Sequence, residues 1–138
     1  MVTISVRYEG DLRCVAVHEP SGAELRTDAP RDNEGLGQSF SPTDLVATGL
    51  ATCVMTIIGN VARRDGIDVA GMTATIEKHM VADPHRRIGR LPMTVTIPGR
   101  LDEGQKQKLE RAAGLCPVSQ SVRGEIDLPL TFVYTADV

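Results

Sequence analysis

Residues 41–66 read SPTDLVATGLATCVMTIIGNVARRDG. Ser41 can cap a helix, Pro42 suits the first helical position, and Asp44 can complete a capping box three residues after the cap. At the other end, an Asp-Gly pair follows Arg64, and glycine after the last turn is typical of a helix stop. These start and stop signals predict one long helix that begins after Ser41 and ends at about Arg64.

The interior of the predicted helix is uncharged. Residues 45–62 contain no Asp, Glu, Lys or Arg, and a run of that length reaches the lower limit for a membrane span. However, the run includes three threonines, two glycines and one asparagine, and Asp44 and Arg63 flank it. We therefore interpret it as a helix buried on all sides in a soluble fold. Because one small sheet cannot cover such a helix, we also expect a homodimer.

Alternating patterns predict three strands before the helix. Residues 2–8 and 12–19 form a hairpin around a Glu-Gly-Asp turn, and residues 24–27 form a short third strand. Residues 29–40 are rich in Pro, Asn, Asp and Gly and lack periodicity. Such a segment is a candidate functional loop, for which a lid is one possible role.

Alternation returns after the helix, over residues 69–80 and 91–97, and it predicts a second pair of strands. Pro92 lacks a backbone donor and so favours an edge position in the sheet. Asp102 with Gln105 predicts the start of a second helix, because an acidic cap followed three residues later by Gln forms a capping box.

The remaining elements complete the fold class. Cys116-Pro117 is typical of the start of a short helix, and residues 128–134 alternate like a last strand. The order β-β-β-α-β-β-α-(α)-β favours an α+β class with mainly antiparallel sheet and excludes a doubly wound nucleotide-binding fold. With 138 residues, we expect a single domain over residues 1–138.

Composition excludes several functions. A net charge of −3 and an aromatic content of 3% disfavour nucleic-acid binding, which needs clustered cations and stacking platforms. The chain has three cysteines, three histidines and no export-signal pattern. An odd cysteine count of this kind predicts free thiols in a reducing cytoplasm. The histidines lie at no short ligand spacing from the cysteines, so we expect no metal site.

The cysteines differ in what they could do. Cys53 lies in the middle of the predicted helix, where a small buried hydrophobic side chain is the simplest interpretation. The helix dipole acts only over the first turn, so a nearby cation would be needed to make Cys53 a reactive thiolate. Cys116 precedes Pro117 at a predicted cap, where free backbone N–H groups favour a thiolate, although an ordinary structural cysteine fits as well. Cys14 is interpreted as packing.

Two segments taken together are more specific than any single cysteine. They are residues 40–53, FSPTDLVATGLATC, and residues 116–119, CPVS. This combination resembles the OsmC/Ohr family of thiol-dependent hydroperoxide reductases. The resemblance extends over nearly the whole chain and includes YEGDLR at residues 8–13, TDAPRDN at residues 27–33 and KHM at residues 78–80.

The resemblance implies a fold, a chemistry and a site. It implies an OsmC-like fold with mainly antiparallel sheets around a long buried central helix, assembled as an intertwined homodimer with active sites at the subunit interface. Cys53 matches the peroxidatic cysteine, which becomes a sulfenic acid, and Cys116 matches the resolving cysteine, which then forms a disulfide with it. Arg13 matches the arginine that lowers the thiolate pKa and polarises the peroxide.

One position departs from the family pattern. Hydroperoxide-specialised members carry a glutamate directly after the proline at this helix start, where it holds the arginine. Here that position is Thr43, and a threonine cannot form the ion pair. Asp44, Asp32 or Glu34 could substitute, although Asp44 is also the expected capping acid. Without a substitute, the arginine would be held loosely and peroxidase activity would be weaker.

Two functions remain open at this point. The first is a cytoplasmic, cofactor-free reductase of organic hydroperoxides that works through a Cys53–Cys116 disulfide and is recycled by a dithiol, for example one of lipoyl type. The second is a binding protein of the same fold, in which the cavity at the dimer interface holds an apolar ligand. The missing glutamate favours the second function, whereas the presence of both cysteines favours the first.

Overall fold

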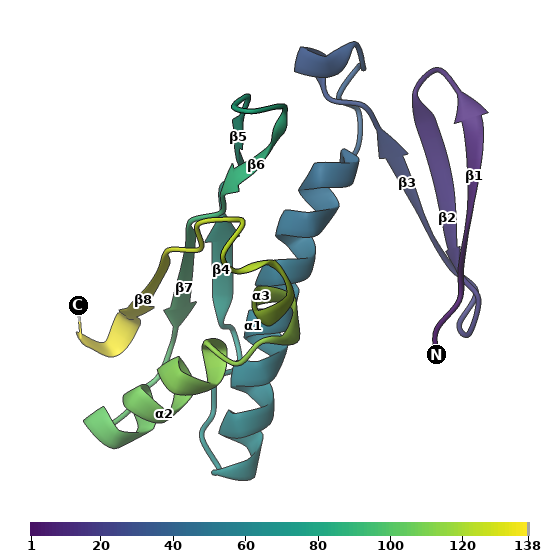
Figure 1. Ribbon diagram of the computed structural model, residues 1–138. Helices are drawn as coiled ribbons and strands as arrows, with labels where there is room; N and C mark the ends of the chain where they lie inside the picture. The colour runs from purple at the N-terminus through teal and green to yellow at the C-terminus, as the bar shows by residue number, and fades with distance from the viewer. Residues whose placement is uncertain (138) are drawn as a thin grey trace. The chain divides into compact units, whose positions relative to one another are not determined.

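The computed structural model of the protein describes residues 1–137. These residues divide into two compact units, one ending at Val46 and the other beginning at Ala47. Each unit has its own antiparallel pairing of strands (Figure 1).

The first unit is built on a three-stranded antiparallel sheet in the order β1-β2-β3. The strands are β1 (Ile4–Gly10), β2 (Arg13–His18) and β3 (Ala23–Asp28). They confirm the three strands predicted before the helix, with bounds shifted by a few residues. The β1–β2 turn needs glycine, because Gly10 has a φ of 89° and the ladder shifts register there.

Residues 29–40 follow β3 and contain one short helix, η1 (Arg31–Asn33). The loop folds back on itself, since the backbone N–H groups of Gly35 and Gly37 donate to Pro30 and Ala29. A Cβ on Gly35 would lie 1.8 Å from the carbonyl oxygen of Ala29, so the close approach requires glycine. The predicted role of this loop as a lid stays a prediction.

Helix α1 (Pro42–Arg64) begins where the sequence predicts. Its N-terminus carries a reciprocal cap: the Asp44 N–H donates to Ser41 Oγ over 3.1 Å, and the Ser41 N–H donates to Asp44 Oδ2 over 2.9 Å. At the other end, the Ile67 N–H donates to the Ala62 carbonyl over 2.8 Å. That bond spans a left-handed Gly66 with a φ of 68°, which is how such helices commonly end.

The second unit contains a three-stranded sheet in the order β4-β7-β8. Its strands are β4 (Thr73–Ile76), β7 (Met93–Ile97) and β8 (Leu130–Tyr134). Strand β7 pairs antiparallel with β4 and parallel with β8. A separate hairpin joins β5 (His79–Val81) to β6 (Arg87–Arg90).

Two expectations about these strands were wrong. Residues 69–80 form two strands instead of one, and β7 occupies the centre of its sheet instead of an edge. The reason lies at Pro92, which falls between β6 and β7. On either side of it, the N–H groups of Leu91 and Met93 donate to Asp127 and Pro129. On the opposite side the Glu77 N–H donates to the Pro92 carbonyl over 3.0 Å, but Pro92 has no N–H to return that bond, so the ladder towards β4 ends there.

Two helices cover the second unit. They are α2 (Glu103–Ala113), with the predicted capping box of Asp102 and Gln105, and α3 (Pro117–Val122), which has Cys116 at its N-cap. A last short helix, η2, spans Thr135–Asp137. The helices and strands together confirm the predicted α+β class.

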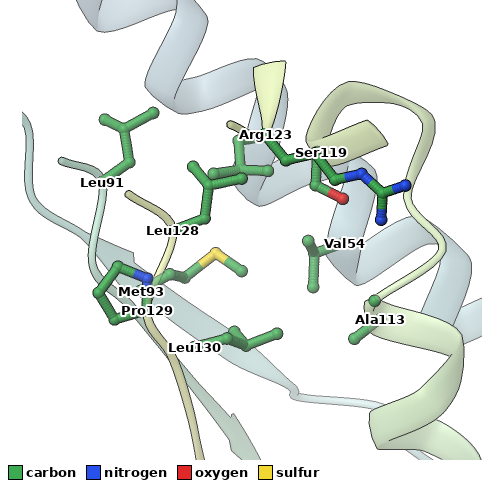
Figure 2. Close-up of a pocket in the computed structure, with 11 residues that line it drawn as sticks. Val54, Leu91, Met93, Ala113, Ser119, Arg123, Leu128, Pro129 and Leu130 are labelled. Carbon is green, nitrogen blue, oxygen red and sulfur yellow. The ribbon is translucent and has the colours of Figure 1, made fainter. Parts of the chain in front are cut away.

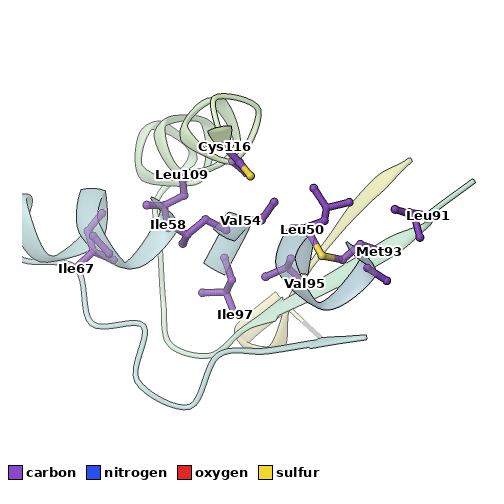
Figure 3. Packing of buried hydrophobic residues seen from close by; sticks show 13 residues of the cluster. Leu50, Val54, Ile58, Ile67, Leu91, Met93, Val95, Ile97, Leu109 and Cys116 are labelled. Carbon is purple, nitrogen blue, oxygen red and sulfur yellow. The ribbon is translucent and has the colours of Figure 1, made fainter. Parts of the chain in front are cut away.

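The core of the second unit lies between α1, α2 and β7 (Figure 3). Helix α1 contributes one row of buried residues at the helical spacing, namely Ala47, Leu50, Val54, Ile58 and Ala62. The alternate residues of β7, Met93, Val95 and Ile97, face this row, and Leu109 of α2 joins them. Each of these nine side chains apart from the two alanines contributes about 1.5–3 kcal/mol by its burial.

Within the single chain, helix α1 is buried along one side, and the expected cover of the remaining side by a homodimer stays a prediction. The side chains of Thr52 and Thr56 are exposed and Val46 is 36% exposed. By length and hydropathy alone, α1 would also pass as a membrane span, a property shared with core helices of soluble proteins. The single chain therefore covers one face of the helix and leaves the other open.

The Leu109→Ala variant should lower the free energy of unfolding by about 2–5 kcal/mol, because it leaves a cavity in the core. Leu109 is fully buried. The matched control is Gln107→Ala, an exposed position on the same helix, for which we expect a change within about 0.5 kcal/mol. Urea denaturation at one fixed protein concentration measures both, and equal values for the two variants would contradict this packing.

Candidate functional site

Cys53 lies about three turns into α1, on the flank of the buried row. Its neighbour Val54 is 2% exposed, whereas Cys53 itself is partly buried. The thiol is therefore held by a helix that the core fixes in place, and it still keeps some access to the outside. The backbone N–H groups around it donate within the helix, so α1 offers the thiol no free N–H donors.

Cys116 occupies the N-cap of α3 and is fully buried. Pro117 stands at the first helical position, as predicted. The Ser119 N–H donates to Cys116 Sγ over 3.5 Å, and Ser119 Oγ donates to the Cys116 carbonyl over 2.9 Å. The cap thus fixes the direction of the thiol and supplies it with one backbone donor.

The structure brings the thiols of Cys53 and Cys116 together. Burial raises the pKa of Cys53, and a side-chain hydrogen bond with Cys116 raises it further. A backbone hydrogen bond from Val118 lowers the Cys53 pKa, while the charge of a Cys116 thiolate would raise it. The net direction is upward. The surroundings of Cys53 in the second unit therefore favour the neutral thiol. None of the three cysteines forms a disulfide within residues 1–137.

Arg13 opens strand β2 in the first unit, where it contacts Asp28 and Gln38. Arg13 Nε lies 3.7 Å from Asp28 Oδ1, and Arg13 Nη2 donates a short hydrogen bond to Gln38 Oε1. Asp28 is the residue directly across the ladder from Arg13. Sequence reasoning missed Asp28 as a partner, although the expected pairing of two neighbouring strands could have indicated it.

Thr43 and Asp44 serve the start of α1. Asp44 accepts from the Ser41 N–H, and Thr43 Oγ1 lies 3.2 Å from Ser41 Oγ. Among the proposed acids, Asp44 therefore performs the capping role that the sequence assigned to it. Cys14 lies in β2 opposite Tyr8 and Thr27 and is partly buried.

An apolar cavity of about 240 Å³ lies in the second unit beside the two thiol-bearing elements. Figure 2 shows side chains of α1, β7, β8 and the segment before β8 turned towards it, among them Val54, Met93, Leu128 and Leu130. Ser119, whose N–H contacts the Cys116 sulfur, also lines the cavity. Its wall is almost wholly aliphatic, which suits an apolar molecule of modest size.

Over residues 1–137, no three His, Cys, Asp or Glu side chains are grouped closely enough to hold a metal ion. The chemistry that these groups can perform by themselves is that of neighbouring thiols: oxidation of one sulfur and condensation with the other.

The fold and the thiol pair define the class: an α+β protein with one cysteine on a core helix, α1, and a second at the N-cap of another helix, α3. The family model described as OsmC-like protein matches residues 35–131 of the chain. The chain therefore belongs to the OsmC-like protein family.

Individual relatives agree with this assignment. An organic hydroperoxide resistance protein of Xanthomonas axonopodis pv. citri (strain 306) is 28% identical over 126 residues, which cover 84% of this chain and 83% of that protein. A protein of Psychrobacter arcticus 273-4, with a proposed role in osmotic stress and detoxification, has a solved structure with a TM-score of 0.90. It is 45% identical, and the match covers 96% of both chains.

A more distant solved structure shares the fold. It is an organic hydroperoxide resistance protein of Elizabethkingia anophelis, with a TM-score of 0.77 at 21% identity over 97% of both chains. The OsmC-like fold expected from the sequence is thereby confirmed. Relatives described as organic hydroperoxide resistance proteins therefore occur both among the sequence matches and among the solved structures.

The Cys116→Ala variant should lower the pKa of Cys53, because it removes both the hydrogen bond and the repulsion that Cys116 imposes on the thiolate. The pH dependence of iodoacetamide alkylation at Cys53, followed by mass spectrometry, measures the pKa, since the thiolate is the reactive form. Cys14→Ala is the matched control and should leave the profile unchanged. An unchanged or higher pKa in Cys116→Ala would show that Cys116 does not act on Cys53.

Proposed function

We propose that this protein reduces organic hydroperoxides with its cysteine thiols. The observation that supports this function most directly is the proximity of Cys53 and Cys116, which lie close enough for Cys116 to raise the pKa of Cys53. Neighbouring thiols of this kind are candidates for a disulfide. The relationship to organic hydroperoxide resistance proteins supports the same reaction class.

The proposed reaction begins at Cys53. Its thiolate attacks one oxygen of the peroxide, so that a sulfur–oxygen bond forms and the oxygen–oxygen bond breaks. The departing alkoxide takes up a proton to become the alcohol, while Cys53 is oxidised to a sulfenic acid. Cys116 then attacks the sulfenic sulfur. A disulfide forms, the sulfur–oxygen bond breaks, and water leaves with the Cys116 proton.

The cycle needs a reductant. A dithiol, which we expect to be of lipoyl type, opens the disulfide by two exchange steps and is itself oxidised to a cyclic disulfide. Both cysteines return to thiols. Such a cycle suits a reducing compartment, and we propose the cytoplasm as the site of action. The chemistry requires neither a metal nor an organic cofactor.

The raised pKa of Cys53 sets a requirement for this mechanism. Burial and Cys116 both disfavour the thiolate, and no cation acts on Cys53 among the causes of its shift. A cation must therefore approach the sulfur in the working enzyme. We propose Arg13 for this role, because its guanidinium is always charged and 39% of its side chain is exposed.

A second copy of the chain is the proposed partner. One face of the β1-β2-β3 sheet exposes large apolar side chains, since Ile4 and Val6 of β1 are 59% and 64% exposed and Leu25 of β3 is 44% exposed. Helix α1 likewise has an uncovered side. Exposed apolar surfaces of this kind mark interaction sites, and a homodimer would cover both.

A second candidate function is the binding of an apolar ligand without turnover. Two observations favour it: the raised pKa of Cys53 and the aliphatic cavity of about 240 Å³ beside the thiols. In that case Cys53 and Cys116 would be structural. Thr43, which stands where hydroperoxide-specialised members carry a glutamate, would reflect the loss of the acid that holds the arginine.

One equivalent of cumene hydroperoxide per chain should remove two free thiols from the native protein, because both sulfurs enter the disulfide. Thiol titration under denaturing conditions measures the loss. We expect no loss in Cys53→Ser. In Cys116→Ser one thiol should be lost as a sulfenic acid, which dimedone traps. The control Cys14→Ser should still lose two. An unchanged thiol count in the native protein, with an apolar probe still bound, would favour the second function.

The native protein should have about twice the monomer mass of 14.8 kDa in light scattering at micromolar concentration. The Val6→Lys variant should shift it towards the monomer, because it places a charge in the exposed apolar face. The control Glu24→Lys changes a residue on the opposite face of the same sheet and should leave the mass unchanged. A monomeric native protein would contradict the proposed assembly.

A further inference from the structure

Asp28 is the buried acid of the first unit. Its side chain is 2% exposed, at the end of β3 and directly across the ladder from Arg13. Asp28 Oδ2 accepts a hydrogen bond from the Gln38 N–H over 3.0 Å. Asp28 Oδ1 accepts none from any residue of the described chain, and the atom that it faces is Arg13 Nε, at 3.7 Å.

A carboxylate in this position is costly. Taking an ionised acid out of water carries a penalty of several kcal/mol, which is offset only by a partner charge and hydrogen bonds. Asp28 has one backbone donor and one guanidinium within reach. A buried charge with so few partners contributes little to the stability of the fold. Its main effect is therefore to attract and orient the guanidinium of Arg13.

Gln38 completes the arrangement from the loop side. Its N–H bonds Asp28, and its side-chain oxygen accepts from Arg13 Nη2. Two contacts to different atoms fix the guanidinium plane more firmly than one contact would. They use Nε and Nη2, so that Nη1 and its two N–H donors stay outside these contacts.

Of the acids considered from the sequence, Asp44 is engaged at the start of α1. Asp44 accepts from the Ser41 N–H in the helix cap. Thr43 carries a hydroxyl that lies beside Ser41 Oγ. The acid paired with Arg13 is Asp28, which is not a neighbour of the helix start in the sequence.

We propose that Asp28, assisted by Gln38, is the positioning residue that holds the Arg13 guanidinium for its role at Cys53. Asp28 would thus take over the role of the family glutamate, whose position is occupied by Thr43 in this chain. The proposal rests on the proposed peroxidase function. Asp28 touches neither sulfur nor peroxide in this scheme and acts through Arg13.

Asp28→Asn tests the proposal in the full-length protein, since Asn keeps the shape and an acceptor for the Gln38 N–H but removes the charge. We expect the second-order rate of cumene hydroperoxide reduction to fall about tenfold. We expect the Arg13 Nε–H resonance, assigned through Arg13→Lys, to broaden or shift towards the position of a free arginine. Glu24→Gln, an exposed acid on the same strand, is the matched control and should change neither quantity.

A double-mutant cycle separates positioning from a structural role. If Asp28 acts through Arg13, Asp28→Asn should cost nothing further in an Arg13→Ala background. An equal loss in both backgrounds, or a native rate in Asp28→Asn, would overturn the proposal. If the wild type fails to reduce the hydroperoxide, the proposed function is wrong. The Arg13 resonance then decides about Asp28 by itself: an unchanged signal in Asp28→Asn overturns its positioning role, and a changed one supports it.

Discussion

Helix α1 packs one row of aliphatic side chains against strand β7, and the position of Cys53 depends on that packing. Leu50, Val54 and Ile58 are almost completely buried, so the helix cannot rotate without exposing them. Rotation is therefore expensive, at about 1.5–3 kcal/mol for each side chain. Because Cys53 precedes Val54, its thiol is fixed on the flank of the core and meets the capping thiol of Cys116.

The same burial creates an electrostatic difficulty. Partial burial and a neighbouring thiol raise the pKa of Cys53, which opposes the thiolate that peroxide chemistry needs. The chain holds an arginine with a buried carboxylate in its other unit, and a guanidinium positioned in this way could supply the missing charge. The proposed enzyme therefore combines a thiol pair held by packing with a cation held by an ion pair.

Much of the secondary structure could be predicted because the signals are local. The caps at Ser41 and Asp102 require only residues three positions apart, and the alternating strands before α1 reveal their own period. The split between β4 and β5 could not be predicted in this way. It depends on Pro92, on the far side of the hairpin, and on the segment before β8, which takes the hydrogen bonds of Leu91 and Met93.

The sequence by itself determined the long uncharged helix, the α+β class and, through its resemblance to a family, the two cysteines to compare. Those conclusions need only periodicity, capping chemistry and short motifs. Only the tertiary structure decided that Asp28 faces Arg13 and that Cys116 raises the pKa of Cys53. Strand register and helix packing bring those groups together across 15 and 63 residues of chain. The expected pairing of neighbouring strands could have made Asp28 a candidate, but no local pattern fixes the register that places it opposite Arg13, nor the contact across 63 residues.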